Sequence, residues 1–323
     1  MYIGESGRSR RNIGTWGGLL VGAAALAGAV ATTAAQAPPV QSERASGAFP
    51  ADRLCEPGTS AARLADPEAH DPSALTSQEA AELDRQLNAA PIAQRTPDSG
   101  QPETIPVVFH VVSAEDGTGD IDNATIGEQI AVMNRGFGGD YGGVDTGFRF
   151  ELAKVTRTAN DAWFGDFGAN EQAIKRELRQ GDAGVLNLYS IDMGQGLLGR
   201  STFPQDYESN SRSDGVVIDY RTVPGGGRDK FDLGHTGTHE TGHWLGLFHT
   251  FQNGCEEPGD YVDDTPYERE QSSGCPEGRD TCTERPGEDP IHNFMNYSDD
   301  KCLFEFTEGQ AERMAKSWAA FRT

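Results

Sequence analysis

The chain has 323 residues, enough for one large domain or two modest ones, and its 27 basic and 50 acidic side chains give a formal net charge of −23. A surface of that sign repels nucleic acids and anionic membranes, which excludes a role in binding either, whereas cationic substrates or calcium ions suit it. The acidic excess can also simply keep an exported protein in solution, but this does not explain why acidic residues cluster between 256 and 264.

The first 37 residues have the pattern of a secretory signal peptide. Arg8, Arg10 and Arg11 form a positive region, and an apolar stretch rich in Ala and Gly follows at 17–30, with small residues behind it. The stretch is shorter than the roughly 20 residues that a membrane-spanning helix needs. We therefore predict a secreted, extracellular protein with no membrane contact after signal removal, and the paired arginines hint at twin-arginine export.

Residues 38–100 differ in composition from the rest. They are rich in Ala, Pro, Asp, Glu and Ser, contain few large apolar residues, and cannot bury much core alone. One amphipathic helix is predicted over 77–89, opened by a capping box of Thr76 and Glu79. This composition is typical of a removable pro-segment that precedes a globular part at 101–323.

Strands and helices alternate in the first half of the globular part. Period-two runs predict strands at 105–112, 148–155, 185–192, 199–203 and 215–220, and helical spacing predicts helices at 124–137 and 171–179. The chain after about 250 is rich in Gly, Pro, Asp and Cys until a last helix at 308–321. We predict an α+β fold with a strand-and-helix subdomain at about 101–249 and a loop-rich subdomain at 250–323.

Five cysteines bear on this organisation. Four lie in the loop-rich half, at Cys255, Cys275, Cys282 and Cys302, and in an exported protein they indicate two disulfides. Four cysteines allow three pairings, and the residues themselves do not choose among them. Cys55 is left over, in the pro-segment.

The stretch HETGHWLGLFH, residues 239–249, predicts a metal site. His239 and His243 are four residues apart and share one face of a helix. His249 reaches the same ion only if the chain turns sharply, and Gly246 stands where the turn needs a residue without a Cβ. Gly237 argues against the helix reaching back as far as His235, which we interpret as structural.

The spacing also predicts chemistry. Zinc held by three protein ligands keeps a fourth position open for water, and Glu240 can take the proton of that water as it attacks a carbonyl. HExxH alone occurs by chance, but H-E-x-x-H-x-x-G-x-x-H is far rarer and is the metzincin signature. Met295, within residues 293–297, fits the Met-turn of metzincins as a hydrophobic floor beneath the metal.

The segments HETGHWLGLFHTF, NFMNYSDD, DGVVIDY and LLGRSTFP resemble the pappalysin family of metzincin zinc metalloproteases, especially its short secreted microbial, ulilysin-like members. The resemblance covers roughly residues 100–315. It implies a proteinase of two subdomains, with a twisted mixed sheet, an active-site helix and a horizontal cleft. It further implies the disulfides Cys255–Cys282 and Cys275–Cys302.

The same resemblance implies further site residues. Asp260, Asp264 and Thr265 match the segment in which family members bind calcium, although a polar surface loop would look the same. Tyr297 matches a tyrosine that stabilises the oxyanion in related metzincins, with a buried aromatic as the alternative. Some family members prefer Arg or Lys directly after the scissile bond because an acid lines that pocket, and Asp299 and Asp300 are the candidates for this acid here.

Cys55 is expected to be a zinc ligand of the latent form. A thiolate can fill the open fourth position, and residues 53–55 match the Arg-x-Cys stretch of related zymogens, although the glycine that commonly follows the cysteine is absent. An exposed thiol awaiting an intermolecular disulfide is the alternative. Activation then requires cleavage between about residues 90 and 101.

Together these features predict a zymogen of a secreted zinc endopeptidase that binds calcium in its loops and acts as a monomer on protein or peptide substrates. The alternative is a catalytically silent, zinc-stabilised adhesion or binding module of the same fold. Glu240 separates the two, because a silent relative has no need of a general base.

Overall fold

The computed structural model describes residues 60–65, 74–91, 102–194 and 196–323. The predicted signal peptide and Cys55 lie outside these residues. One mixed sheet of six strands organises the described part, in the order β1-β5-β6-β4-β2-β3. The strands are β1 (Ser60–Leu64), β2 (Glu103–Ser113), β3 (Phe148–Ala159), β4 (Leu186–Ile191), β5 (Leu197–Thr202) and β6 (Val216–Asp219).

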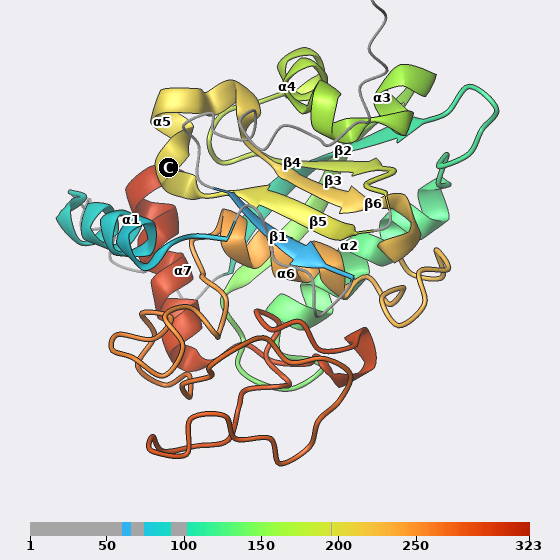
Figure 1. Ribbon diagram of the computed structural model, residues 1–323. Coiled ribbons are helices and arrows are strands. Elements are labelled where there is room, and N and C mark those ends of the chain that lie inside the picture. The colour runs from blue at the N-terminus through green and yellow to red at the C-terminus, as the bar shows by residue number, and fades with distance from the viewer. Residues whose placement is uncertain (1–59, 66–73, 92–101, 195) are drawn as a thin grey trace, which may run out of the picture. The chain divides into compact units, whose positions relative to one another are not determined.

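Four strands run parallel, and the edge of the sheet does not. β3, β2, β4 and β6 pair in parallel, β5 pairs with β6 antiparallel, and β1 pairs with β5 antiparallel (Figure 1). The predicted mixed sheet is therefore confirmed. The sequence did not predict β1, which lies in the segment interpreted as a pro-segment.

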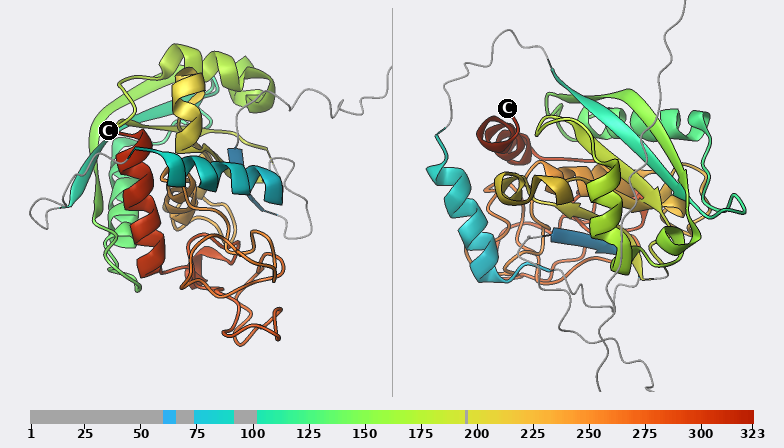
Figure 2. Two further views of the ribbon diagram at one scale, coloured as in Figure 1. Left: turned by 90° about the vertical axis from the view of Figure 1, so that its left-hand side faces the viewer. Right: turned by 90° about the horizontal axis from the view of Figure 1, so that it is seen from above.

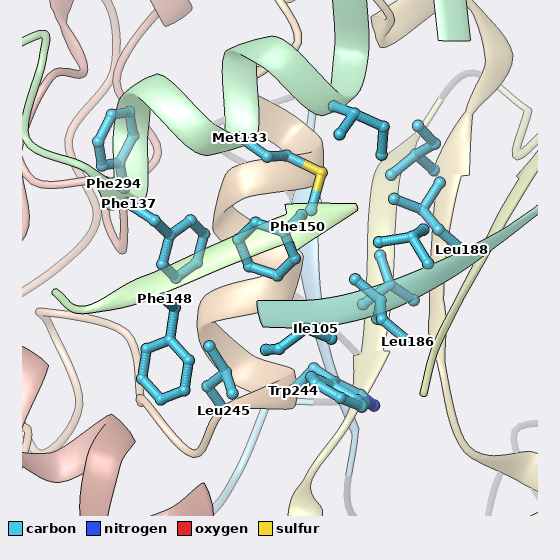
Figure 3. Packing of buried hydrophobic residues seen from close by; sticks show 14 of the residues in the cluster. Ile105, Met133, Phe137, Phe148, Phe150, Leu186, Leu188, Trp244, Leu245 and Phe294 are labelled. Atoms are coloured by element: carbon cyan, nitrogen blue, oxygen red, sulfur yellow. The ribbon is translucent and has the colours of Figure 1, made fainter. Parts of the chain in front are cut away.

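Helices cover both faces of the sheet. On one side lie α2 (Asn123–Phe137), α6 (His235–Trp244) and α7 (Glu308–Phe321), and on the other lie α3 (Asp161–Gly165) and α4 (Phe167–Leu178) (Figure 1). Strand alternation supplies both cores: in β2, Phe109 and Val111 join the α2 and α6 side, whereas Val112 joins the α3 and α4 side. Figure 3 shows the first core, where aromatic side chains of α2 and β3 meet Trp244 and Leu245.

The remaining helices are α1 (Ser77–Ala89) and α5 (Tyr207–Asn210), with short 3-10 turns at Pro204–Asp206, Ser211–Ser213, Tyr220–Thr222 and Asp300–Cys302. The predicted capping box of Thr76 and Glu79 opens α1. α1 lies beside α7 (Figure 2), where Asp84 accepts a hydrogen bond from Arg313 at 2.7 Å.

The chain between 245 and 307, all of which the structure describes, has no helix or strand beyond one 3-10 turn and an isolated bridge between Asn293 and Glu305. The disulfides Cys255–Cys282 and Cys275–Cys302 connect it, which is the interleaved pairing that the resemblance implied. In the chain-entropy model, each closed loop of this size contributes about 3 to 4 kcal/mol to a region with little apolar core.

Candidate active site

Three histidine side chains converge beneath the sheet. The Nε2 atoms of His239 and His243 are 3.1 Å apart, and the Nε2 of His249 lies 3.3 Å from the first and 3.0 Å from the second. All three residues are buried. Within the described ranges, this is the one group of three or more His, Cys, Asp or Glu residues whose ligand atoms all lie within 4.8 Å of one another.

A sharp bend brings the third histidine to the other two. α6 ends at Trp244, and Gly246 follows with φ of +98°, a conformation that favours glycine. The Gly246 amide donates to the carbonyl of His243 at 2.8 Å. A Cβ on Gly246 would lie 2.5 Å from the Oγ of Ser317 on α7, so close packing requires a glycine here as well. The predicted bend is present.

The histidines have the protonation state that metal binding requires. The Nδ1 of His239 lies 2.6 Å from the carbonyl oxygen of Phe294, and that of His243 lies 2.7 Å from the carbonyl oxygen of Leu247. A carbonyl only accepts hydrogen bonds, so each Nδ1 carries the proton and each Nε2 presents a lone pair. Burial lowers the pKa of all three histidines, that of His243 to about 4.

Lone pairs facing one another at these distances repel unless a cation lies between them. Zn–N bonds of about 2.0 to 2.1 Å in a tetrahedron place ligand nitrogens about 3.3 Å apart, close to the separations seen here. The donor set therefore fits zinc, bound by His239, His243 and His249.

Met295 forms the floor of the cluster. A Cβ on Gly242, in α6, would lie only 2.4 Å from the Sδ of Met295, so the turn packs directly against the helix that carries the histidines. Asn293 fixes this turn: its Oδ1 accepts from the Met295 amide at 2.9 Å, and its side-chain amide exchanges hydrogen bonds of 2.8 and 3.0 Å with Gln310 of α7. The methionine therefore has a defined place beneath the ligands.

Glu240 is buried and lies against β5. A Cβ on Gly199 would come within 2.7 Å of Glu240 Oε1 and 2.6 Å of its Cγ, so only glycine leaves room for the carboxylate at that point of the strand. The Oε1 atom accepts a hydrogen bond of 3.1 Å from the backbone amide of Arg63. The carboxylate of the HExxH motif thus faces the backbone of β1.

β1 lies along β5 in an extended conformation beside the histidine cluster. Its register pairs Ala61 with Ser201, Ala62 with Arg200 and Arg63 with Gly199. The hydroxyl of Tyr297 donates to the carbonyl oxygen of Ala62. The Ala62–Arg63 peptide group therefore has Tyr297 on its carbonyl and Glu240 on its amide.

The side chain of Arg63 fills a fully enclosed pocket. Its Nη1 lies 2.9 Å from Asp300 Oδ1 and 3.3 Å from the hydroxyl of Thr236. Its Nη2 donates to the carbonyl of Ser298 at 2.8 Å, and the guanidinium stands 5.1 Å from the ring centre of Phe231. Both side chains of the Arg63–Asp300 ion pair are 0% exposed.

The structure also distinguishes the two aspartates singled out after the Met-turn. Asp300 points into the pocket, and its second oxygen accepts from the Leu233 amide at 3.0 Å. Asp299 faces Lys301 instead, with 3.8 Å between Oδ2 and Nζ. No sequence pattern identified Thr236, Ser298 or Phe231 as pocket residues.

His110 and His235 lie outside the cluster. α6 begins at His235, so the expectation that Gly237 would shorten the helix was wrong. The reason is packing: a Cβ on Gly237 would lie 2.5 Å from the side-chain amide nitrogen of Gln129, so a glycine at this position lets α2 pack closely against α6. His110 is a buried strand residue that hydrogen bonds to Asn187 at 3.0 Å, as its position in the strand indicated.

In the segment matched to calcium binding, one of the three residues is already hydrogen-bonded and the other two have oxygens available to a ligand. Asp264 is committed to the start of α7, because its oxygens accept from the Thr307 hydroxyl at 2.7 Å and the Gly309 amide at 2.9 Å. Asp260 Oδ2 and Thr265 Oγ1 are buried without a hydrogen-bond partner of normal geometry. Burial raises the pKa of Asp260 to about 8. Asp260 and Thr265 line a hollow of about 780 Å³ between α1, α7 and loop 257–267.

Comparison with known proteins decides the family. A family model described as pregnancy-associated plasma protein-A, of peptidase family M43, matches residues 199–319. An extracellular metalloprotease of Verticillium alfalfae is 47% identical over 223 residues, which are 67% of this chain and 76% of that protein. The chain belongs to this family of metalloproteases. Extracellular metalloprotease 1 of Coccidioides posadasii is 46% identical over 231 residues, 70% of this chain and 80% of its own.

Solved structures agree with the assignment to the M43 metalloproteases. Mature mirolysin of Tannerella forsythia in complex with a cleaved peptide matches with a TM-score of 0.61 and 28% identity, over 68% of this chain and 96% of that one. A promirolysin mutant of the same organism matches with a TM-score of 0.62 and 26% identity, over 76% and 88%. The predicted pappalysin-type fold is confirmed.

The relatives are named extracellular, which confirms the predicted location. In the described residues, no helix is both long enough and apolar enough to cross a membrane.

Proposed function

We propose that the protein is a secreted, zinc-dependent endopeptidase in which Glu240 is the general base. The observation that carries the proposal is the Ala62–Arg63 peptide group, which lies between Glu240 and Tyr297 beside the three histidines. A backbone amide in this position stands in for the bond of a substrate. Zinc held by the histidines supplies a water of lowered pKa, which is a nucleophile at neutral pH.

The protein side chains carry the remaining steps. Glu240 accepts the proton of the attacking water and returns it to the amine that leaves, and its Oε1 lies 3.1 Å from the nitrogen in that position. Tyr297 donates to the carbonyl oxygen, where negative charge develops. The edge of β5 holds the substrate backbone extended through main-chain pairing.

The Arg63 pocket supports a preference for Arg or Lys directly after the scissile bond. The pocket is closed, Asp300 supplies the carboxylate that faces the guanidinium, and the Ser298 carbonyl and the Thr236 hydroxyl also accept from its two Nη atoms. Arginine is favoured over lysine, because the planar fork reaches two acceptors at once.

A peptide library distinguishes the proposed endopeptidase from the alternative, a catalytically silent binding module. The activated protein, with and without a zinc chelator, is compared with Glu240→Gln under the same conditions. We expect cleavage before basic residues that is lost on chelation and in the variant. A chain that binds zinc but cuts nothing would be the silent adhesion or binding module.

We further propose that the enzyme is made as a latent monomer, with residues 1–37 as signal peptide, 38–100 as pro-segment and 101–323 as catalytic domain. The support for latency is β1, which occupies the cleft in the place of a substrate. The role of Cys55 as a metal ligand of the latent form stays a prediction, since Cys55 lies outside the described residues. Faster activation of Cys55→Ser than of wild type would support it, and unchanged latency would contradict it.

We propose calcium in the loop near Asp260. The buried Asp260 Oδ2, which lacks a hydrogen-bond partner of normal geometry, the nearby Thr265 hydroxyl and the acidic hollow beside them support a hard cation. Asp264 contributes by fixing α7 rather than through a free oxygen, so backbone carbonyls or water must complete the ligand set. Calorimetric titration of the zinc-loaded protein with calcium, beside Asp260→Asn, tests the site.

A further inference from the structure

The contacts on β1 are more specific than blocking a cleft requires. A segment that only blocks the cleft has to fit its shape. It does not have to align one particular peptide bond with the catalytic groups. Here the carbonyl of Ala62 accepts from Tyr297, and the amide of Arg63 donates to Glu240. These are the two ends of a single peptide bond, and each meets the group that acts on that end in hydrolysis.

The direction and side chain of β1 match as well. β1 runs antiparallel to β5, and register pairing holds from Ser60 opposite Thr202 to Leu64 opposite Leu197, with an irregularity between Arg63 and Leu64. The residue after the aligned bond is Arg63, whose guanidinium is sealed against Asp300. Backbone register, side-chain pocket and catalytic contacts therefore select the same bond.

The described part of the proposed pro-segment contains one other arginine, Arg85, which lies on a helix and not in the cleft. Arg85 lies on α1, with its side chain 70% exposed and paired with Glu82 one helical turn away. A helical backbone cannot pair with β5, because its amides and carbonyls are already bonded within the helix. Arg85 therefore offers a matched comparison in the same segment.

We propose that the Ala62–Arg63 peptide bond is a cleavage site of the enzyme itself, and that its hydrolysis within the same molecule is an activation step. The inference rests on the proposed endopeptidase function and names one substrate of that site, the chain's own segment. Water adds across the bond: its oxygen joins the carbonyl carbon of Ala62 as the C–N bond breaks, and the departing nitrogen of Arg63 takes the proton. The products are a carboxylate on Ala62 and a new amino terminus on Arg63.

The cut loosens the segment on one side. Ala61 and Ala62 no longer connect covalently to Arg63, so β1 loses the continuity on which its pairing with β5 depends. Residues from 63 on remain attached through α1, which is anchored by the Arg313–Asp84 contact and by a 3.1 Å bond from Gln205 to the carbonyl of Leu83. The cleft then becomes accessible while α1 stays in place.

The test follows the new amino terminus in the full-length secreted protein. Free α-amines are labelled during incubation with zinc, and mass spectrometry quantifies chains that begin at Arg63. We expect this terminus in wild type, at a rate independent of protein concentration, and its absence in Glu240→Gln. Arg63→Glu should lower its formation about 100-fold, Arg63→Lys should retain slow cleavage, and Arg85→Glu should behave as wild type.

A second readout does not depend on cleavage. In the uncut Glu240→Gln chain, β1 should protect from hydrogen exchange those amides of residues 199–201 that point to β1 rather than to β6, and Arg63→Glu added to that chain should increase their exchange. Wild type that digests peptides before arginine yet never yields the Arg63 terminus would overturn the inference and leave the proposed function standing. Failure to digest either the peptides or its own segment would overturn both.

Discussion

Asp300→Asn isolates the charge in the pocket that holds Arg63. Asparagine has nearly the same shape as aspartate and can still accept the 3.0 Å hydrogen bond from the Leu233 amide. The change removes the negative charge that lies 2.9 Å from the guanidinium and replaces the oxygen that accepts from Nη1 by an amide NH2, at a point where neither side chain touches solvent. It therefore tests electrostatics rather than packing.

The expected magnitude follows from burial. Removing one partner of a buried ion pair costs about 3 to 5 kcal/mol, because the remaining charge is left without compensation. The Ser298 carbonyl, the Thr236 hydroxyl and the Phe231 ring stay in place, so the lower end applies. At about 1.4 kcal/mol per factor of ten, kcat/KM for cleavage before arginine should fall roughly 100-fold.

The assay uses two fluorogenic peptides, one containing Ala-Ala-Arg-Leu and one with leucine in place of arginine. The arginine peptide should lose about 100-fold in kcat/KM, and the leucine peptide should change less than about threefold, since it never used the charge. Asp299→Asn is the matched control, because Asp299 faces Lys301 outside the pocket. If Asp299→Asn impaired arginine cleavage and Asp300→Asn did not, the assignment of the pocket would be refuted.

Three further changes test other parts of the site. Tyr297→Phe should lower kcat by about 10²- to 10³-fold with little change in KM, because the hydroxyl acts on developing charge; an equal effect on KM alone would assign it to binding. Gly242→Ala should lower the melting temperature and zinc affinity, because the new Cβ would lie 2.4 Å from the Met295 sulfur; a fully stable, zinc-loaded variant would show that the floor can move. The pKa of Asp260 is raised by burial to about 8, and that of an unfolded aspartate is about 4, so the folded calcium-free protein binds the extra proton between these values. Stability should therefore fall as pH rises from about 4 to 8 without calcium, and calcium or Asp260→Asn should abolish that slope; thermal melts that show the same slope in all three would contradict it.

The sequence predicted the elements whose signals are local. The spacing of His239, His243 and His249 with Gly246 defined the metal cluster, because helix geometry and one left-handed residue determine it within eleven positions. Strand alternation located β2 and the rest of the parallel sheet for the same reason. The disulfide pairing was not accessible in this way and came from the family resemblance alone.

β1 and most of the Arg63 pocket escaped prediction, because both depend on residues far apart in the chain. Residues 60–64 contain no β-branched or aromatic side chain, and they form a strand only because β5 offers an unpaired edge. The Arg63 pocket combines the start of α6 with residues beyond the Met-turn, which no short pattern connects. Asp300 and Asp299 could be proposed as a pair from the sequence, but only the fold separates them.

The edge strand β5 requires an extended backbone in the chain that pairs with it, whatever the side chains of that chain are. Its main chain pairs with five consecutive residues of β1, and such pairing accepts almost any sequence but only a straight backbone. A helix, or a strand already bonded inside another protein, cannot present its backbone in that way without first unfolding locally. With the proposed preference for arginine, loops, linkers and denatured chains would therefore be open to attack, while stable folds would not. The proposed enzyme would therefore discriminate first by the local stability of its target.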